Sequence, residues 1–271
     1  MTDDPDGWFG ERVAASYDAD SGMADAASVD PVVDTLLELA GTGRLLEFAI
    51  GTGRIALPLA ARGATVHGIE LSRAMLARFA EKPGSADIEV TVGDMASTRV
   101  AGTFAVVYLV FNTIMNLTTQ AAQVDCFRNA AAHLQPGGRF VVEVMVPQLQ
   151  RLPPGETFVP FHVSDDHWGI DEYDLVGQGL VSHHLRLGND RRERFSLPTR
   201  YVWPAELDLM AQLAGMHLEA RWADWRRRPF TDTSPSHVSV WRSTLGSPSR
   251  RWRVRGRGSP APGPPPRNTG R

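Results

Sequence analysis

Residues 45–54 read Leu45-Leu46-Glu47-Phe48-Ala49-Ile50-Gly51-Thr52-Gly53-Arg54, an apolar segment that runs directly into a glycine turn. The apolar part predicts a short strand over 44–49, and the residues after the turn predict a helix over 55–62. Glycines at such a turn allow positive φ angles and a close approach of the backbone to a ligand. The stretch therefore predicts a strand–turn–helix unit with a ligand site at the end of its strand.

The same alternation continues on both sides of this unit. Apolar periodicity and capping residues predict helices over 30–40, 72–80 and 118–134, of which the first opens with Pro31 and the last with Thr118 and Thr119. Strands are predicted over 64–70, 88–92, 104–110 and 140–146, the third of them uniformly apolar like a buried parallel strand. This order predicts an α/β fold with a doubly wound, mostly parallel, seven-stranded sheet of Rossmann-like type.

The pattern changes after Pro147. Segments 158–163, 173–185 and 193–202 read as strands separated by turn signals such as Gly188-Asn189-Asp190. A helix then begins at Trp203-Pro204 and ends at Gly215, and segments 217–225 and 237–241 are predicted to pair as an antiparallel hairpin. We therefore expect an antiparallel β insertion over 147–202, next to the carboxyl ends of the parallel strands, where open α/β sheets bind ligands.

The composition restricts the class of protein. The chain has 271 residues, of which 42% are hydrophobic, and this is enough to form a sizeable core. Its longest apolar run, 104–111, is far shorter than the roughly 20 residues of a membrane helix, and the acidic start MTDDPDGWFG lacks the apolar region of a secretory signal. Cys126 is the only cysteine, which excludes internal disulfides and cysteine-based metal clusters. We expect a cytoplasmic protein without a membrane partner.

Charge is distributed unevenly along the chain. Residues 242–271 contain eight arginines and no acid, so residues 1–241 carry 20 basic and 31 acidic side chains. An acidic body argues against a nucleic-acid partner. The Pro-, Gly- and Arg-rich segment 243–271 is predicted to be disordered, because it has little apolar surface to bury. It is either an arm for RNA, DNA or an acidic partner or an unselected extension, and the lack of interleaved aromatic residues favours the second.

Two further acidic residues follow the ends of the second and third predicted strands. Glu70 can accept both hydroxyls of a ribose, and Asp94 can accept from an adenine amine while Met95 packs on the ring. The glycine turn fits a dinucleotide such as NAD as well as S-adenosylmethionine. Glu47 favours the second ligand, because an acid at this position repels a pyrophosphate and suits a sulfonium ligand with its amino group.

Together these features resemble the class I S-adenosylmethionine-dependent methyltransferases. The acid-and-glycine loop of that family corresponds to residues 47–53, and its ribose and adenine acids correspond to Glu70 and Asp94. Further marks of the family are Leu71-Ser72-x-x-Met75-Leu76, Gly93-Asp94-Met95 and Leu134-Gln135-Pro136-Gly137-Gly138-Arg139-Phe140. The arrangement over 201–241 resembles the small-molecule branch, which includes N-methyltransferases of amino sugars and of glycine.

The resemblance implies one methyltransferase domain over 1–242. It comprises a cofactor-binding core at 40–146, a substrate-covering insertion at 147–202 and a C-terminal helix and hairpin at 203–242. S-adenosyl-L-methionine is the implied cofactor, and an amine or hydroxyl of a small molecule is the implied methyl acceptor. The residues implied to bind the cofactor are Tyr17, Glu47, Ala49, Gly51, Gly53, Arg54, Glu70, Leu71, Met75, Asp94, Met95, Val110, Phe111 and Asn116.

Tyr17 and Ala49 both concern the methionine end of the predicted cofactor site. Tyr17 is implied to close over the methionine carboxylate of the cofactor. Ala49 stands where the family has its first glycine, and its methyl group is expected to crowd the methionine end of the loop. This departure leaves a catalytically inactive S-adenosylmethionine-binding protein as one alternative, and an NAD-dependent oxidoreductase is the other.

Methyl transfer from a sulfonium is an in-line displacement, which depends on near-attack geometry and exclusion of water more than on a base. No single catalytic residue stands out, and the candidates for a base or positioning group are Asn112, Glu143, His162 and His167. His183 and His184 are adjacent on a predicted strand, so they are expected to face opposite sides. The spacing of histidines and acids matches no zinc motif, and no metal is expected.

Overall fold

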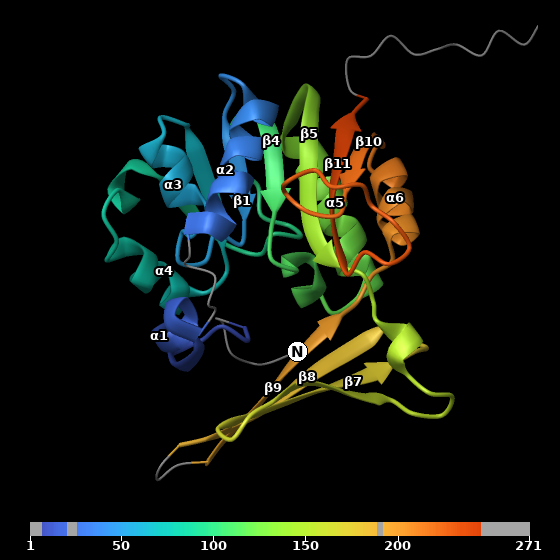
Figure 1. Ribbon diagram of the computed structural model, residues 1–271. Helices are drawn as coiled ribbons and strands as arrows, with labels where there is room; N and C mark the ends of the chain where they lie inside the picture. Colours follow the sequence, from blue (N-terminus) through green and yellow to red (C-terminus); the bar gives the residue numbers. More distant parts are fainter. Residues whose placement is uncertain (1–6, 21–25, 189–191, 245–271) are drawn as a thin grey trace, which may run out of the picture.

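The computed structural model describes residues 7–20, 26–188 and 192–244. Its larger layer is a seven-stranded sheet with the strand order β10-β11-β5-β4-β1-β2-β3 (Figure 1). The strands from β3 to β5 in this order run parallel, whereas β11 is antiparallel to both β5 and β10. The strands are β1 Leu45–Phe48, β2 Val66–Glu70, β3 Glu89–Val92, β4 Phe104–Leu109, β5 Leu134–Met145, β10 Met216–Trp222 and β11 Ser236–Ser243. The predicted doubly wound sheet with a final antiparallel hairpin is confirmed.

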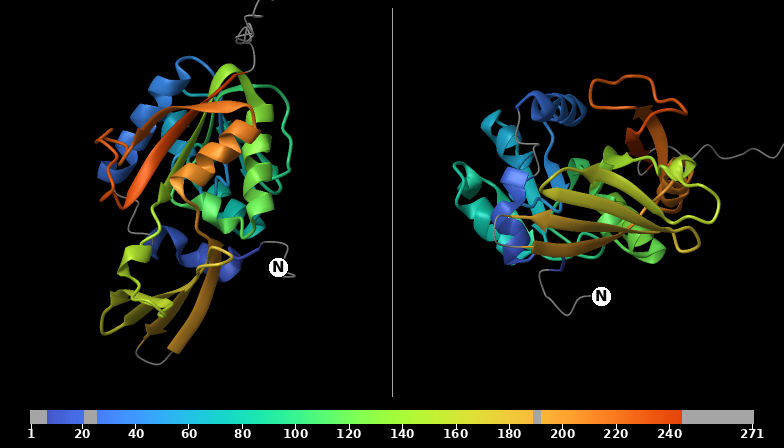
Figure 2. Two further views of the ribbon diagram at one scale, coloured as in Figure 1. Left: turned by 90° about the vertical axis from the view of Figure 1, so that its right-hand side faces the viewer. Right: turned by 60° about the horizontal axis from the view of Figure 1, so that its bottom comes forward.

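Helices cover both faces of this sheet (Figure 2). Alternate side chains of a strand point to opposite faces, so the neighbours Leu45 and Leu46 enter two different apolar clusters. On the Leu46 side, Phe127 of the fifth helix packs against Phe140 and Trp241, with ring centroids 4.9 and 5.3 Å apart. The helices are α1 Glu11–Asp20, α2 Ala26–Ala40, α3 Ala56–Ala61, α4 Arg73–Ala80, α5 Gln120–His133 and α6 Pro204–Leu213.

Two helix beginnings are set by the hydroxyl groups that the sequence predicts as caps. Ser72 Oγ accepts a hydrogen bond from the Met75 amide at 3.0 Å, and Thr119 Oγ1 accepts one from the Ala122 amide at 3.2 Å. Each bond satisfies a backbone donor that the first turn of a helix leaves without an intrahelical partner. The caps therefore fix where α4 and α5 begin, next to the carboxyl ends of β2 and β4.

Several predicted boundaries are wrong, and β5 begins at Leu134 and not at residue 140. The helix predicted over 30–40 already begins at Ala26, so Pro31 lies within α2, because the preceding alanines are strong helix formers. The strand predicted over 173–185 is two strands joined by a turn. Asp174 accepts a hydrogen bond from the Val176 amide at 3.0 Å, and Gln178 has a φ of 58°. The apolar Leu175 and Val176 imitate a strand in the sequence although Val176 is almost fully exposed.

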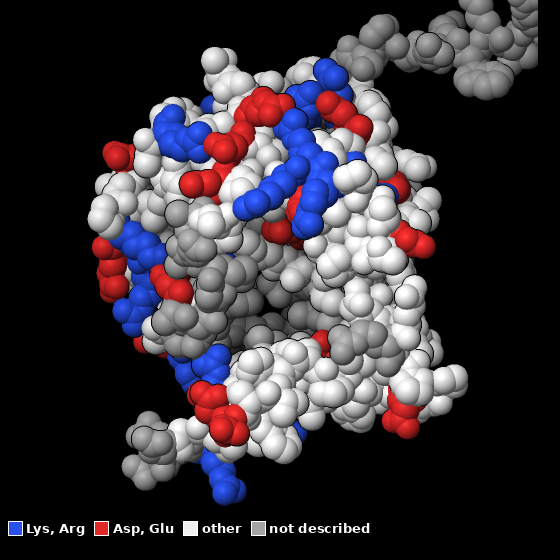
Figure 3. All heavy atoms as spheres, viewed as in Figure 1, with Lys and Arg blue, Asp and Glu red and all other residues white. Residues whose placement is uncertain are grey.

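The insertion after β5 forms a separate four-stranded antiparallel sheet in the order β6-β7-β8-β9. It lies across the carboxyl ends of the parallel strands, with α1 beside it (Figures 1 and 2). On the face seen in Figure 3, charged side chains gather on the larger body, and the surface is hollowed between this body and the insertion. The strands are β6 Phe158–Val163, β7 His167–Asp174, β8 Gly179–Leu187 and β9 Arg192–Arg200. The predicted helix-poor β insertion is confirmed.

The folded part of the chain extends slightly beyond its predicted end at residue 242. Strand β11 continues through Ser243, and the Thr244 amide donates to the carbonyl of Gly215 at 3.0 Å. The predicted disordered tail, from residue 245 onward, and most of the predicted turn at 188–190 lie outside the described residues. Within the described ranges, no helix is both long and apolar enough to cross a membrane.

Candidate active site

The turn after β1 places alternate residues in the left-handed region of φ. Ala49, Gly51 and Gly53 have φ angles of 54°, 58° and 82°. A Cβ atom on Gly53 would lie 2.6 Å from the ring of Phe79, so glycine is required there for packing as well as for φ. Ala49 is a non-glycine residue in the same conformation. The positive φ gives the physical reason why glycine suits this position, and Ala49 adopts it at a cost in conformational energy.

Glu70 joins this turn to the end of β2. Its Oε2 accepts a hydrogen bond from the Gly51 amide, and its Oε1 accepts one from the Ser72 amide, both at 2.8 Å. Only 7% of the residue is exposed. Because a carboxylate offers about four lone-pair sites, both oxygens keep capacity for a ligand's hydroxyl groups. The side chain is thus fixed in orientation at the crevice that the sequence predicts for a ribose.

Asp94 and Met95 lie at the end of β3, as predicted. Asp94 is exposed, and its Oδ1 accepts a hydrogen bond from the Ala96 amide at 2.7 Å, so the carboxylate is oriented by its own turn. Met95 is buried, and its carbonyl accepts from Asn129 Nδ2 at 2.7 Å. Leu71, after β2, keeps 42% of its surface exposed. An exposed acceptor beside apolar side chains is suited to a flat base with an amine edge.

Glu47 lies inside β1 and not on the surface of the crevice. It is 3% exposed, and its Oε2 accepts a hydrogen bond from the Tyr108 hydroxyl at 2.8 Å. Burial raises the pKa of Glu47 to about 8, partly offset by the bond from Tyr108. At neutral pH the carboxyl group is therefore mostly protonated. The sequence places a negative charge here beside the ligand, whereas in the structure the group is buried and its raised pKa favours the neutral form.

Arg54 is held between two aromatic rings at the end of the glycine turn. Its guanidinium carbon lies 5.3 Å from the ring centroid of Tyr17 and 4.7 Å from that of Phe111. Tyr17 comes from α1 and Phe111 from the loop after β4, so three distant segments converge here. Such an arrangement places a positive charge between apolar faces. It can receive a carboxylate, which matches the end of the crevice predicted for the methionine part of the cofactor.

Helix α1 is fastened over this turn by polar contacts. The Thr52 hydroxyl donates to Asp18 Oδ1 at 2.6 Å, and Lys82 Nζ donates to the Thr52 carbonyl at 2.8 Å. Further along, the Ser72 hydroxyl donates to the Phe9 carbonyl at 2.7 Å. The N-terminal segment is thereby placed above both the glycine turn and the start of α4. From this N-terminal segment the sequence analysis predicts a role only for Tyr17.

The catalytic candidates Asn112 and Glu143 brace the loop after β4. Phe111 and Asn112 have φ angles of 55° and 63°. Glu143 accepts a hydrogen bond from the Phe111 amide at 3.0 Å, and burial raises its pKa. The Met145 amide donates to Asn112 Oδ1 at 2.7 Å. Both side chains therefore hold a strained turn that presents Phe111 to Arg54, and a direct catalytic role for either remains a prediction.

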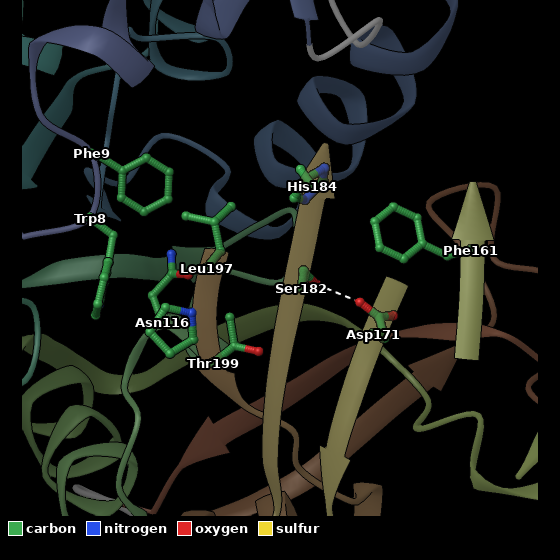
Figure 4. A pocket seen from close by; sticks show the side chains of 10 residues that line it. Trp8, Phe9, Asn116, Phe161, Asp171, Ser182, His184, Leu197 and Thr199 are labelled. Carbon is green, nitrogen blue, oxygen red and sulfur yellow. Dashed lines mark hydrogen bonds between the residues drawn. The ribbon is translucent and has the colours of Figure 1, made fainter. Parts of the chain in front are cut away.

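A cavity of about 250 Å³ lies between the N-terminal segment, the loop after β4 and the four-stranded sheet. We call it the insertion pocket. Figure 4 shows its side chains, and Asn116 is the one residue of the predicted cofactor set among its described lining. The lining residues are Trp8, Phe9, Asn116, Phe161, Asp171, Ser182, His184, Leu197, Pro198 and Thr199. Its apolar walls and few converging polar groups are typical of a small-molecule site.

The catalytic candidates His162 and His167 share the sheet face of His184 but are not among the described residues that line this pocket. His167 Nε2 is 2.9 Å from His184 Nδ1, and the His162 and His167 rings are 4.6 Å apart. His184 lines the pocket itself, while His183 faces the other side and contacts Glu172 at 2.9 Å. The predicted opposite orientation of the two neighbours is confirmed. Among the described residues, no group of three or more histidine, cysteine or acidic side chains could hold a metal ion.

Sequence reasoning missed most of the insertion pocket. Trp8 and Phe9 stand in an acidic N-terminal stretch without periodicity, and nothing local connects them to a sheet more than 150 residues later. Asp171 and Ser182 were missed because the strand boundary between them was wrong. With the correct turn at 175–178, their positions on paired strands would have been a usable signal, since residues opposite each other share a face.

Comparisons with known proteins agree with this architecture. Residues 45–138 match the methyltransferase domain family. The structure of the CcbJ methyltransferase from Streptomyces caelestis is 36% identical in sequence and has a TM-score of 0.79, over 89% of this chain and 99% of that one. The cypemycin N-terminal methyltransferase of a Streptomyces species is 27% identical over 236 residues, which is 86% of this chain and 96% of the relative.

A third similarity concerns the fold. The S-adenosylmethionine-bound structure of CalS10, an amino pentose methyltransferase from Micromonospora echinaspora, has a TM-score of 0.63 at 23% identity, over 85% of this chain and 97% of that one. The similarity to CcbJ covers 89% of this chain and thus extends far beyond the glycine turn. An NAD-dependent oxidoreductase, the alternative that the glycine turn left open, is therefore wrong. The chain belongs to the class I S-adenosylmethionine-dependent methyltransferases.

Proposed function

We propose that the protein transfers the methyl group of S-adenosylmethionine to a small molecule. Of the two expected acceptor groups, amine and hydroxyl, we propose the amine nitrogen. The observation that carries this proposal is the insertion pocket, which borders the loop after β4 and is walled by aromatic side chains. A pocket of about 250 Å³ suits a compact molecule. The names of two relatives, an N-terminal methyltransferase and an amino pentose methyltransferase, support nitrogen as the nucleophile.

The contacts in the crevice support separate roles for its residues in binding the parts of the cofactor. Glu70 is proposed to accept from the ribose hydroxyls and Asp94 from the adenine amine, because each carboxylate is oriented by backbone donors. Arg54 is proposed to pair with the methionine carboxylate, with Tyr17 and Phe111 holding its guanidinium in place. The remaining predicted residues are proposed to shape the crevice: Glu47, Ala49, Gly51, Gly53, Leu71, Met75, Met95, Val110 and Asn116.

When bound, S-adenosylmethionine supplies a methyl group on a positively charged sulfur. The acceptor's lone pair attacks this methyl carbon in line, the carbon–sulfur bond breaks, and its electron pair goes to sulfur. The chain's part is to orient the nucleophile and to exclude water. Trp8 and Phe9 from the N-terminal segment and Phe161 from the insertion close the pocket from different sides. We infer from this that the core at 40–146 binds the cofactor while the insertion at 147–202 covers the acceptor.

The loop after β4 is proposed to position the reaction. Glu143 and Asn112 hold its strained backbone, so they are positioning residues in this proposal and do not remove a proton. His167 is proposed to support His184 from the same sheet face, with His162 stacked against His167, and neither is proposed to touch the acceptor. The product ammonium then loses its proton to solvent.

The test uses methyl-labelled S-adenosylmethionine, the purified chain and a cell extract separated into small-molecule, protein and nucleic-acid fractions. The proposal expects label in the small-molecule fraction, in a form that carries N-methyl groups, and much less label with the Glu70→Ala variant at limiting cofactor concentration. Label only in protein or nucleic acid would overturn it. Label in small molecules as O-methyl groups would keep the substrate class and overturn the choice of nitrogen.

A further inference from the structure

One carboxylate faces the insertion pocket. Strands β7 and β8 pair with Asp171 opposite Ser182, so both side chains lie on the same face of the sheet. The Ser182 hydroxyl donates to Asp171 Oδ1 at 2.6 Å, and both residues line the pocket (Figure 4). This bond fixes the orientation of the carboxylate and uses one of about four lone-pair sites. Asp171 is thus held ready to accept from a ligand.

The pocket lining does not neutralise this charge. Among the described residues that line it, Asp171 is the sole acid, and none is lysine or arginine. The nearest basic side chain in the lining is His184, whose pKa is lowered to about 4 by burial and by the neighbouring His167, so it is neutral at neutral pH. Burial raises the pKa of Asp171 itself, which shows that its charge is costly where it stands. A positively charged ligand would remove this cost.

Aromatic faces surround the same space. Trp8, Phe9 and Phe161 line the pocket, and the Phe161 and His184 rings are 5.3 Å apart. The Phe161 ring lies against Gly169, where a Cβ atom would come within 2.4 Å of it, so glycine at this position leaves room for the ring. Aromatic faces attract cations through their quadrupole and also bury the apolar part of an amine. The Asp171 carboxylate and the aromatic rings therefore both favour a positively charged ligand.

We place the methyl transfer near the loop after β4, and Asp171 lines the insertion pocket from a different element. Asn116, from the loop after β4, borders the pocket on the cofactor side, whereas Asp171 is on β7, separated from β9 by β8. Two strand spacings are about 10 Å. In addition, a protonated amine has no lone pair with which to attack a methyl group. A cation at Asp171 is therefore a different group from the nucleophile.

We propose that the insertion pocket takes an acceptor with a protonated amine in addition to its nucleophile, and that Asp171 pairs with this amine and determines specificity. The proposal rests on the proposed small-molecule methyl transfer and adds the second charged group of the substrate. Asp171 acts by anchoring, so it affects acceptor binding and not the chemical step.

The test compares two probes of the same shape, phenethylamine and 2-phenylethanol, by calorimetry on the protein saturated with S-adenosylhomocysteine. The wild-type protein is expected to bind the amine at least about tenfold more tightly than the alcohol, as a charge-assisted hydrogen bond contributes at least that much. Asp171→Asn keeps an oxygen that can accept from Ser182 and removes the charge. It should bring the two affinities within about twofold of each other.

The matched control is Glu172→Gln, which removes the same charge one residue away on the opposite face, where Glu172 contacts His183. This variant should keep the tenfold preference. Equal binding of amine and alcohol by the wild type, or a preference that survives in Asp171→Asn, would overturn the inference. Tighter binding of sorbitol than of phenethylamine would also overturn it and would assign Asp171 to hydroxyl groups.

Affinity for S-adenosylhomocysteine, measured first in each variant, separates the two proposals. An unchanged cofactor affinity together with a lost amine preference supports the anchoring role, and it shows that Asp171→Asn is folded. If no label enters the small-molecule fraction while the amine preference is present, the proposed reaction is wrong and the proposed cation site at Asp171 is retained. If label enters small molecules but no amine preference exists, only the cation site falls.

Discussion

Lys82 Nζ lies 2.6 Å from Asp18 Oδ2 and so joins α1 to the end of α4. The same ammonium group donates to the Thr52 carbonyl in the glycine turn at 2.8 Å. Lys82 is the only lysine of the chain, in a sequence that otherwise uses arginine. A compact ammonium group fits between a carboxylate and a carbonyl that lie close together, where the planar fork of an arginine does not. The contact links α1 to the glycine turn and to the end of α4.

Replacing Lys82 with alanine should therefore weaken the attachment of α1 to the glycine turn. The pair is partly exposed, so its contribution is modest, and we expect the Kd of S-adenosylmethionine to rise about twofold to fivefold, mainly through faster dissociation. Stopped-flow fluorescence and calorimetry measure both quantities. Arg78→Ala removes an exposed ion pair with Glu81 on the same helix and serves as control. Equal dissociation rates in the two variants would mean that the Lys82 contact does not hold α1 to the glycine turn.

Glu70→Ala should weaken cofactor binding by about 1.5–3 kcal/mol, the contribution of hydrogen bonds to a charged group. The same change removes the acceptor of the Gly51 and Ser72 amides, so the free protein should also unfold at a lower temperature. Calorimetry with S-adenosylmethionine and thermal unfolding without it separate the two effects. Glu81→Ala, a change at an exposed acid after α4, should alter neither. Wild-type affinity in the Glu70→Ala variant would remove Glu70 from the site.

Ala49→Gly should stabilise the protein although it adds a glycine. The φ of Ala49 is 54°, where a Cβ atom costs roughly 1 kcal/mol that glycine does not incur. We expect the free energy of unfolding in urea to increase by about 0.5–1 kcal/mol, and cofactor affinity to rise or stay the same. Ala77→Gly, at an exposed site within α4, should instead lose about 1 kcal/mol. A destabilised Ala49→Gly variant would show that the alanine conformation is not strained.

Acid should destabilise the protein through His237. This residue is fully buried, its Nδ1 is 2.8 Å from Ser239 Oγ, and burial followed by the charge of Arg221 lowers its pKa from 6.5 to about 4. The unfolded chain takes up the proton first, so the free energy of unfolding should be level above pH 6.5 and fall as the pH drops towards 4. The lowered pKa corresponds to a loss of about 3 kcal/mol over this range.

Urea unfolding of wild-type protein and His237→Gln at a series of pH values measures this effect. His237→Gln should have a shallower slope between pH 6.5 and 4, whatever its stability at pH 8. His217→Gln, at an exposed histidine on β10, should keep the wild-type slope. Parallel curves for wild type and His237→Gln would show that His237 does not remain neutral in the folded protein.

The fold around the predicted cofactor crevice could be predicted from the sequence because its signals are local. The glycine turn, the caps at Ser72 and Thr119 and the acids Glu70 and Asp94 each depend on a few neighbouring residues. The alternation of strands and helices then brings the strand ends to one edge of the sheet. The protonation of Glu47 could not be predicted in this way, because burial in the folded chain raises its pKa and its partner Tyr108 is 61 positions away.

The insertion pocket, where we propose that the acceptor binds, was decided by tertiary structure alone. The insertion pocket brings Trp8 and Phe9 together with Asp171 and Ser182, and no local pattern connects these segments. Their meeting depends on how α1 and the four-stranded sheet pack against the carboxyl ends of the parallel strands. That packing is fixed by contacts between distant residues, such as Lys82 with Asp18 and Ser72 with Phe9. Periodicity reports which face of an element is buried, whereas only the packed chain determines which other element lies against that face.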